Sequence, residues 1–329
     1  MNFAFLEIIK PHKTIHWVLY GLVVFLLTFC LVGWDIFLGL PNKDEIKNYR
    51  IHSTVESFEN FNWEQVEQRP VRKWLPLSAI AANLQKAVII SEDDTFFEHK
   101  GVNLQMVKEA FKVNLTRRRY ARGASTITMQ LARNAFLTKE KSLIRKLKEI
   151  IVARRIEESL TKGQILELYL NIVEWGENIY GAEAAAQYYF GKAAYELNLA
   201  ESSLLASILP NPKRFNPFRG IGTAKKLQKR VLDLMRLSRI LDEQTAVATY
   251  GTPIYLRDQL PEESKIDAFQ HVVAAESLTN SPPDSTVNTV MDFPDSIAHS
   301  NKSIFDSFSI HINFRDKANP DSSSTERFK

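Results

Sequence analysis

The stretch from about Trp74 to Tyr250 constrains the fold most, because its apolar residues recur with the spacing of an α-helix. Few runs in it alternate with the two-residue period of a strand, so a sheet-dominated fold is disfavoured. Thr161 is the expected N-cap of one helix, and Gly191 is the expected stop of another. The sequence therefore predicts a mainly α-helical fold. Helical periodicity or good helix formers mark seven segments, at 84–91, 104–115, 142–160, 162–172, 181–190, 197–209 and 223–241.

An apolar segment without a charged residue runs from Trp17 to Trp34, which is long enough for a membrane-spanning helix. Lys10 and Lys13 precede it and Asp35 follows it, which predicts a cytoplasmic N-terminus with the bulk of the chain outside, on the periplasmic or extracellular face. The run exceeds a signal-peptide core, and no small-x-small cleavage site follows it. A buried core helix is the alternative. We expect residues 1–14 to be a cytoplasmic tail and residues 15–40 to be a single-pass anchor in the cytoplasmic (inner) membrane.

The composition changes on both sides of the helical region. Residues 41–69 are mixed and polar, and we expect them to be a linker to the main domain at 70–245. Residues 246–329 are expected to be a largely disordered extension, because 276–329 is rich in Ser, Asp, Asn and Pro. The formal net charge of +4 does not indicate nucleic acid. A single cysteine, Cys30, excludes an intramolecular disulfide and a cysteine-based metal cluster.

Two carboxylates are candidates for chemistry. Glu92 opens the motif E-D-D-T-F-F-E-H-K-G directly after an apolar segment. Partial burial beside phenylalanines moves the pKa of a carboxyl group toward the working pH, which suits a general base. Glu149 shares one stripe of a helix with Lys146, Ala153 and Glu157. A solvated acidic turn and a solvated charged face are the alternatives for these two motifs.

Between the two carboxylates, R-G-A-S-T-I-T-M-Q-L-A-R offers hydroxyls, an amide and a guanidinium that suit pyrophosphate and sugar oxygens. A helix start capped by Ser or Thr is the alternative. Four arginines within positions 117–122 would attract phosphates or anionic lipid headgroups, unless they lie in a solvated loop. G-x-x-x-x-G-K and H-E-x-x-H motifs are absent, and S-x-x-K with K-T-G is absent as well, which argues against a penicillin-type acyl-transfer domain.

Five blocks in this order resemble glycosyltransferase family 51, in its branch of monofunctional biosynthetic peptidoglycan transglycosylases. Any one block is weak, but five in register are specific, and together they span roughly residues 70–240. Met129 stands where many members carry glutamine and Arg133 where many carry lysine, so Met129 is given no polar role. The blocks are E-D-x-x-F-x-x-H-x-G from Glu92, G-A-S-T-I-T-x-Q-L from Gly123, K-x-x-E-x-x-x-A-x-x-x-E from Lys146, I-L-x-x-Y-L-N to Y-F-G-K over 165–192, and A-E-x-x-x-L-A with prolines over 200–217.

The resemblance implies a lysozyme-like helical head lobe, a smaller membrane-associated jaw lobe at 106–120, and polymerisation of lipid II into glycan strands. Glu92 would deprotonate the 4-hydroxyl of the acceptor GlcNAc, which attacks C1 of the donor MurNAc and expels undecaprenyl pyrophosphate. Glu149 would be the second catalytic residue, either orienting cations or holding a divalent metal such as Mg²⁺ or Mn²⁺. No cofactor is obligatory. The residues expected to bind substrate are Asp93, Phe96, His99, Gly123, Ser125, Thr126, Gln130, Arg133, Lys141, Arg145, Lys146 and Asn171.

The expected partners are lipid II, the growing glycan strand and membrane lipid, with cell-wall synthesis or division proteins left open and nucleic acid excluded. Two other functions remain alternatives. One is a glycan-cleaving lytic enzyme or muramidase, which also uses a glutamate in a helical lobe. The other is a non-catalytic anchored scaffold for cell-wall assembly. The cationic residues and the anchor argue against the first, and a Glu92→Gln variant would distinguish the second.

Overall fold

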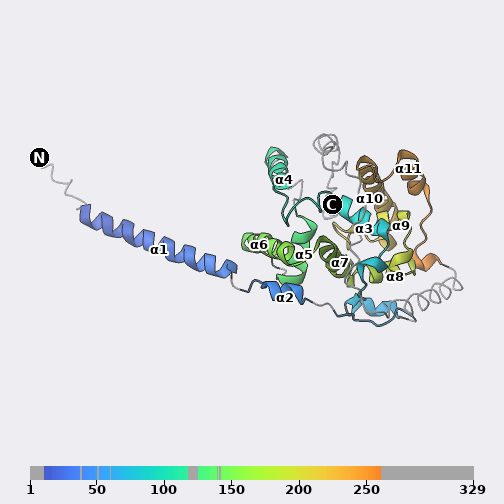
Figure 1. Ribbon diagram of the computed structural model, residues 1–329, viewed down its shortest axis with the longest axis horizontal. Coiled ribbons are helices and arrows are strands. Elements are labelled where there is room, and N and C mark those ends of the chain that lie inside the picture. The colour runs from blue at the N-terminus through green and yellow to red at the C-terminus, as the bar shows by residue number, and fades with distance from the viewer. Residues whose placement is uncertain are drawn as a thin grey trace, which may run out of the picture. The chain divides into compact units, whose positions relative to one another are not determined.

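The computed structural model describes residues 11–37, 39–49, 52–59, 61–117, 125–138, 140 and 142–260 of the chain (Figure 1). These residues fall in the first of two units, residues 1–288, and the second unit, 289–329, lies outside the described part. The helices are α1 Pro11–Phe37, α2 Lys43–Lys47, α3 Ala82–Glu92, α4 Leu104–Arg117, α5 Ile127–Phe136, α6 Leu143–Ser159, α7 Lys162–Ile172, α8 Ala182–Phe190, α9 Leu199–Ile208, α10 Pro217–Leu237 and α11 Glu243–Gly251.

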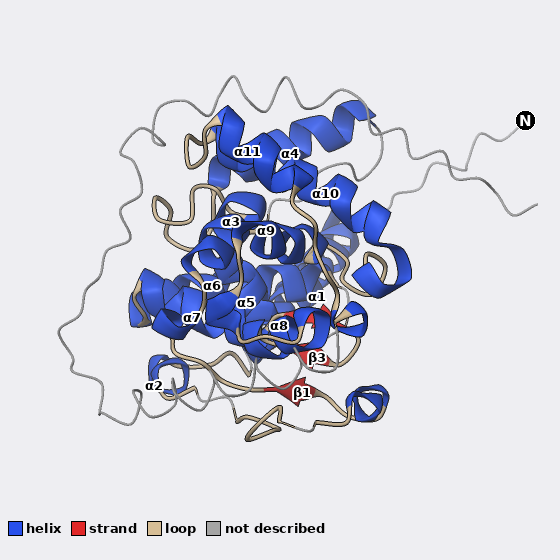
Figure 2. Cartoon of the chain, turned by 90° about the vertical axis from the view of Figure 1, so that its right-hand side faces the viewer, coloured by secondary structure: helices blue, strands red, loops and turns tan. Residues whose placement is uncertain are grey.

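A small sheet of three short strands accompanies the helices (Figure 2). The strands are β1 Val71–Arg72, β2 Glu174–Gly176 and β3 Ile179–Tyr180. β3 lies in the middle, parallel to β1 and antiparallel to β2. The described part of the chain is therefore mainly helical, as the periodicity predicts.

The core is built around α9, every residue of which is buried from Ala200 to Ile208. Because no side of α9 faces solvent, other elements have to cover it all round. Accordingly, α3 and α10 both pack against α9. A second group consists of α5 between α6 and α7. Glu92 ends α3 in the first group, and Glu149 lies on α6 in the second, so the two groups carry one candidate carboxylate each.

All seven predicted helical segments are helices in the structure. Thr161 caps α7 by accepting a hydrogen bond from the backbone N–H of Gln164, whose side-chain oxygen in turn accepts from the Thr161 N–H. Gly191 ends α8 in the left-handed conformation, at φ 65°. α10 includes a short turn at Pro217–Arg219, which Asn216 caps, and a kink at Gly220 separates this turn from the predicted helix. α5 follows the Ser/Thr-capped start that the sequence indicated, with Thr126 as its N-cap.

The flanks of the main domain are more ordered than the sequence suggested. Residues 41–69, expected to be a linker, contain α2 and a 3-10 helix over Trp63–Glu67. Ile46, Phe58 and Val66 are buried there, and α2 packs on α6. Residues 246–260, expected in the extension, contain the end of α11 and the buried Leu256. The rest of the predicted disordered extension, 261–329, lies outside the described residues.

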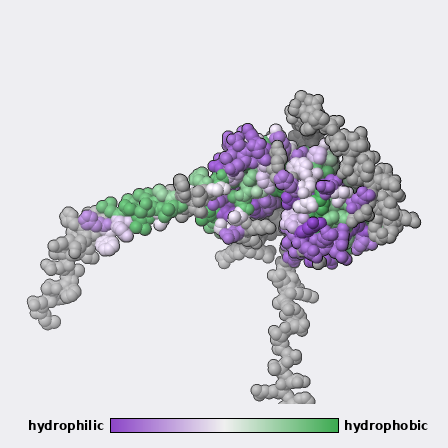
Figure 3. Space-filling view, turned by 90° about the horizontal axis from the view of Figure 1, so that it is seen from below, coloured by the Kyte–Doolittle hydropathy of each residue, from purple (hydrophilic) through white to green (hydrophobic). Residues whose placement is uncertain are grey.

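Helix α1 covers most of the region predicted to be an anchor. Hydrophobic residues gather along it (Figure 3). Among the residues that the structure describes, no helix combines the length and the apolar character that a membrane crossing requires. Residues 1–10 of the predicted cytoplasmic tail lie outside the described residues.

Candidate active site

Glu92 stands at the last position of α3, where the helix opens into the acidic turn. Its side chain is partly exposed, whereas the neighbouring Asp93 is 1% exposed. Burial raises the pKa of the Glu92 carboxyl group, and the charge of Asp93 acts in the same direction. A hydrogen bond from Gln130 and the charges of Arg133 and Arg230 oppose this increase in the Glu92 pKa. The result is a carboxylate that holds its proton more tightly than a solvated glutamate.

Gln130 fixes one oxygen of this carboxylate. Its Nε2 donates to Oε2 of Glu92 at 2.8 Å, and its Oε1 accepts from the hydroxyl of Tyr169 at 3.1 Å. Because an ionised carboxylate can only accept, the NH2 group of the amide faces Glu92, which leaves Oε1 of Gln130 to accept from Tyr169. Tyr169 is fully buried, and burial raises the pKa of its hydroxyl well above the usual value. Tyr169 of α7 therefore helps to position Glu92 by way of Gln130 on α5.

Asp93 anchors the turn that follows Glu92. Both of its oxygens lie 2.9 Å from Nε2 of His99, and Oδ2 also accepts from the backbone N–H of Ile127 at 2.9 Å. Nδ1 of His99 accepts from the Gly101 N–H at 3.1 Å, so the proton of the neutral ring is on Nε2, facing Asp93. Asp93 and His99 thus join the turn to the start of α5.

Gly101 allows this turn to approach α6 closely. Its φ of +87° is in the region that favours glycine, and a Cβ there would lie 2.9 Å from the carbonyl oxygen of Ala153. The hydroxyl of Thr126 donates to the Gly101 carbonyl at 2.6 Å while accepting from the Met129 N–H. The small residues of the motifs at Gly101 and Ala153 therefore serve close packing of the turn, α5 and α6.

Glu149 lies in a cationic cluster on α6. It is 1% exposed, and its two oxygens are ion-paired with Arg145 and, at 2.7 Å, with Lys146. Nζ of Lys146 also donates to the hydroxyl of Ser125 at 2.8 Å, immediately before α5. Arg145 is held further by the backbone carbonyl of Glu140. Glu149 thereby holds two cations in place at the N-terminal end of α6.

A second ion pair involves Lys162, which the sequence analysis did not select. Its Nζ bonds Glu157 and the His99 carbonyl, both at 2.7 Å, and lies 4.5 Å from the ring centre of Phe96. Glu157 also accepts from the hydroxyl of Thr128 at 2.6 Å. The K-x-x-E-x-x-x-A-x-x-x-E block includes Glu157, but nothing local in the sequence identifies Lys162 as a partner of the His99 carbonyl or Tyr169 as a partner of Gln130.

The structure brings most of the predicted site residues to one place. The segment from Ser125 through α5 contacts Glu92 by Gln130 and the Glu149 cluster by Ser125. Arg133, later on α5, is half-buried and acts on the pKa of Glu92 through its charge. Met129 is buried, in agreement with the expectation that it has no polar role. Gly123 and Lys141 lie outside the described residues.

Asn171 differs from the other predicted site residues. It is 1% exposed, and its side chain bonds the backbone N–H and carbonyl of Leu75 and the carbonyl of Glu167. These contacts use the amide to attach the segment before α3 to α7. In the structure, the Asn171 side chain therefore supports the fold.

A family model described as Transglycosylase matches residues 59–236. The biosynthetic peptidoglycan transglycosylase of Janthinobacterium sp. (strain Marseille) is 42% identical over 166 residues, which cover 50% of this chain and 71% of that protein. The protein with this description from Paraburkholderia xenovorans (strain LB400) is 42% identical over 177 residues, 53% of this chain and 74% of its own. The protein with this description from Paraburkholderia phytofirmans (strain DSM 17436 / LMG 22146 / PsJN) is 41% identical over 206 residues, which cover 57% of this chain and 86% of that protein.

Proposed function

We propose a mechanism for this chain, which belongs to the transglycosylase family and is a glycosyltransferase that polymerises peptidoglycan glycan chains in cell-wall biosynthesis. Its substrates are lipid II and the glycan strand. The relatives are described as biosynthetic, which favours strand growth over glycan cleavage and over a scaffold without activity. The observation that carries the mechanism is that one segment, Ser125 with α5, connects a base-like carboxylate to a cationic cluster.

Glu92 acts as the general base. Its raised pKa makes the carboxylate a stronger proton acceptor than a solvated glutamate. Gln130 occupies Oε2, so the other oxygen, Oε1, takes the proton from the 4-hydroxyl of the acceptor GlcNAc. As that proton leaves, the hydroxyl oxygen attacks C1 of the donor MurNAc, and the bond from C1 to the pyrophosphate oxygen breaks.

Arg145 and Lys146 stabilise the leaving group. Negative charge develops on the pyrophosphate as the bond from C1 breaks, and fixed cations stabilise that charge more in the transition state than in the ground state. Glu149 holds both cations, and Ser125 orients Lys146 from the side of α5. Arg133 on α5 adds a third positive charge, close enough to act on Glu92.

The surroundings of Glu149 do not fit a divalent metal. Both carboxylate oxygens already bond cationic side chains, and a metal ion at that point would be repelled by Arg145 and Lys146. Groups of three or more His, Cys, Asp or Glu with ligand spacing are absent from the described residues. We therefore assign Glu149 the task of orienting cations and derive no step through a metal.

The test is polymerisation of lipid II by the purified full chain and by a Glu92→Gln variant. Loss of the base is expected to reduce turnover by at least about 10²-fold, because general-base catalysis contributes roughly that much or more. Glu98→Gln is the matched control, since Glu98 is an exposed carboxylate of the same motif, and it should retain turnover. Turnover by Glu92→Gln close to that of the control would show that another group is the base.

The membrane arrangement is part of the proposal. Enzyme and lipid-linked substrate would share one plane if the charge-free run from Trp17 to Trp34 anchors the chain in the inner membrane, with the catalytic domain on the periplasmic face. α4, with Leu104 and Leu115 exposed, would then be the jaw lobe and the rest of the domain the head lobe. Alkaline carbonate extraction of membranes tests the anchor: the full chain should stay in the pellet, and a chain that starts at residue 41 should be released.

A further inference from the structure

Helix α6 has a second surface, which the mechanism does not use. Its catalytic side carries Lys146, Glu149 and Ala153. Ile150, Ile151 and Arg154 lie about 100–200° around the helix from Glu149, on the opposite side. Leu143 and Leu147, earlier on this side, are 86% and 48% exposed. Large aliphatic side chains exposed in a row are unusual on a soluble surface and mark a site of contact.

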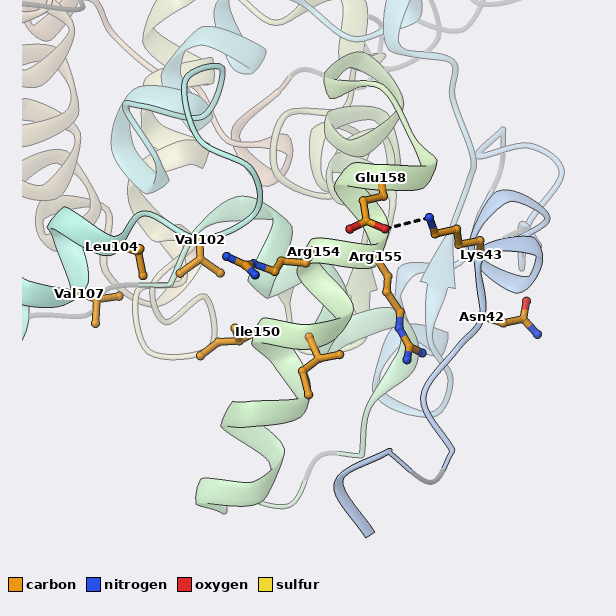
Figure 4. A pocket seen from close by; sticks show the side chains of 10 residues that line it. Asn42, Lys43, Val102, Leu104, Val107, Ile150, Arg154, Arg155 and Glu158 are labelled. Atoms are coloured by element: carbon orange, nitrogen blue, oxygen red, sulfur yellow. Dashed lines mark ion pairs between the residues drawn. The ribbon is translucent and has the colours of Figure 1, made fainter. Parts of the chain in front are cut away.

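This surface borders a groove of about 690 Å³ (Figure 4). Ile150 and Ile151 line it from α6, and Val102, Leu104 and Val107 line it from the start of α4 and the residues before it. Leu104 and Val107 are 70% and 39% exposed, so the described residues leave this aliphatic lining open to solvent. The volume suits one small amphiphile or part of a larger one.

The charged residues of the groove lie next to this lining. Three are cationic (Lys43, Arg154 and Arg155) and one is acidic (Glu158). Lys43 is paired with Glu158 at 2.9 Å, and Arg155 donates to the Pro41 carbonyl at 2.8 Å. In contrast, Arg154 has no hydrogen-bond acceptor or ion-pair partner among the described residues, and Figure 4 shows it extended toward Val102. The charge of Arg154 acts on Glu158, but that carboxylate is ion-paired with Lys43, so the Arg154 guanidinium keeps its hydrogen-bond donors available. An arginine of this kind beside aliphatic side chains complements a ligand that is both anionic and apolar.

We propose that this groove binds an anionic phospholipid, with the acyl chain on the aliphatic lining and the phosphate on Arg154. The proposal rests on the proposed function in one respect, since an enzyme that polymerises lipid II works at a membrane surface. The excess of positive charge favours an anionic headgroup over a zwitterionic one. α6 then holds the catalytic cations on one side and a membrane lipid on the other. A bound lipid would therefore set the orientation of the catalytic side relative to the membrane.

The experiment is native mass spectrometry of the full chain in detergent, with dioleoyl phosphatidylglycerol or dioleoyl phosphatidylcholine added. The wild type should retain phosphatidylglycerol preferentially. Arg154→Gln should bind it roughly fivefold more weakly, as expected for one arginine at a membrane surface. Val107→Asp, which places a carboxylate in the aliphatic lining, should weaken binding of both lipids. Arg219→Gln, at an exposed arginine of α10, is the matched control and should bind like the wild type.

Two outcomes would overturn the proposal. One is equal retention of the two lipids by the wild type, and the other is an Arg154→Gln variant that binds phosphatidylglycerol as the wild type does. Displacement of phosphatidylglycerol by farnesyl pyrophosphate would also overturn it, because the groove would then belong to the polyprenyl substrate. Glu92→Gln separates this proposal from the mechanism, since it should lose polymerisation and keep the lipid. Polymerisation by Glu92→Gln would refute the assignment of Glu92 as the general base and would leave the proposed lipid site unaffected.

Discussion

At the residue scale, the carboxylate of Glu92 combines two opposing demands. The proposed mechanism needs it ionised, while its burial and the charge of Asp93 favour the protonated form and raise its pKa. The hydrogen bond from Gln130 and the charges of Arg133 and Arg230 offset part of that increase. A carboxylate held in this way is expected to cost folding stability, because the ionised form is solvated better in the unfolded chain.

The pH dependence of turnover and of stability should show this cost. The acid limb of kcat/KM is expected above the pKa of about 4.3 of a free glutamate. Because the pKa is higher in the folded state, stability is lost as pH rises from the unfolded pKa through the folded pKa. Glu92→Gln should therefore raise the melting temperature at pH 7, and the gain should shrink near pH 4. An equal gain at both pH values, or an equal gain in Glu98→Gln, would contradict this explanation.

Tyr169 is expected to act on the reaction through Gln130. In Tyr169→Phe the Gln130 amide loses one of the two hydrogen bonds that hold it, so it can turn away and its hydrogen bond to Glu92 is lost for part of the time. Without that hydrogen bond the pKa of Glu92 should rise further, moving the acid limb to higher pH. We expect kcat to fall roughly two- to tenfold, which corresponds to one hydrogen bond worth about 0.5–1.5 kcal/mol, with little change in KM.

Tyr189→Phe is the control for this effect. Tyr189 is also a fully buried tyrosine, but its hydroxyl donates to the Trp175 carbonyl and does not contact Gln130. This variant should lose stability without moving the acid limb. An unchanged pH profile in Tyr169→Phe would leave Tyr169 with a structural role only.

At the element scale, the site depends on how closely the turn after α3 approaches α6. Gly101 and Ala153 meet backbone to backbone, and Thr126 and Asp93 attach the start of α5 to the same turn. Helices α3, α5 and α6 are therefore held together where their chemical groups are needed.

Gly101→Ala should disrupt this contact. The left-handed backbone conformation costs about 1–2 kcal/mol for a residue with a Cβ, and the added methyl would also press on the Ala153 carbonyl. Gly163→Ala is the matched control, because nothing lies within 4 Å of a Cβ at that position. Alanine forms helix better than glycine, so this change in α7 should increase the free energy of unfolding by at most about 1 kcal/mol. Urea denaturation measures both. Equal changes in the two variants would show that the contact at Gly101 contributes nothing.

At the scale of the whole molecule, segments before and after the main domain hold each other. Arg257 lies 4.5 Å from the ring centre of Trp63 and 5.3 Å from that of Tyr188. Phe58, Phe61 and Trp63 form one aromatic cluster, which reaches α8 through Tyr188. The segment with Arg257 also covers Gly191, where a Cβ would meet the side chains of Leu260 and Arg257.

Arg257→Ala should loosen both flanks. Burial lowers the pKa of Arg257, so its cation is already poorly solvated, and stacking on two rings is its main compensation. We expect a loss of about 1–2 kcal/mol in the free energy of unfolding, together with faster proteolysis near residues 252–260. Lys226→Ala, at an exposed lysine of α10, is the control. An unchanged melting temperature in Arg257→Ala would mean that the rings hold the flank without the cation.

Helix α7 and its ends could be predicted from the sequence because their causes are local. The bounds of α7 at 162–172 and its cap at Thr161 depend on residues within a few positions, and so does the stop of α8 at Gly191. The order of the motifs also follows from the sequence alone, and it identifies Glu92 and Glu149 as candidate catalytic residues. Local pattern thus determined the helices and the residue types available for chemistry.

Which residues act on substrate and which act on the fold was decided only by tertiary packing. Asp93 and Asn171 belong to the same motifs as Glu92 and Tyr169, yet their side chains bond buried backbone groups. The link from Tyr169 to Glu92 joins three helices, and the ties from Trp63 to Arg257 span most of the domain. Such contacts depend on how helices pack in space, and no pattern of neighbouring residues encodes a distance between segments far apart in the chain.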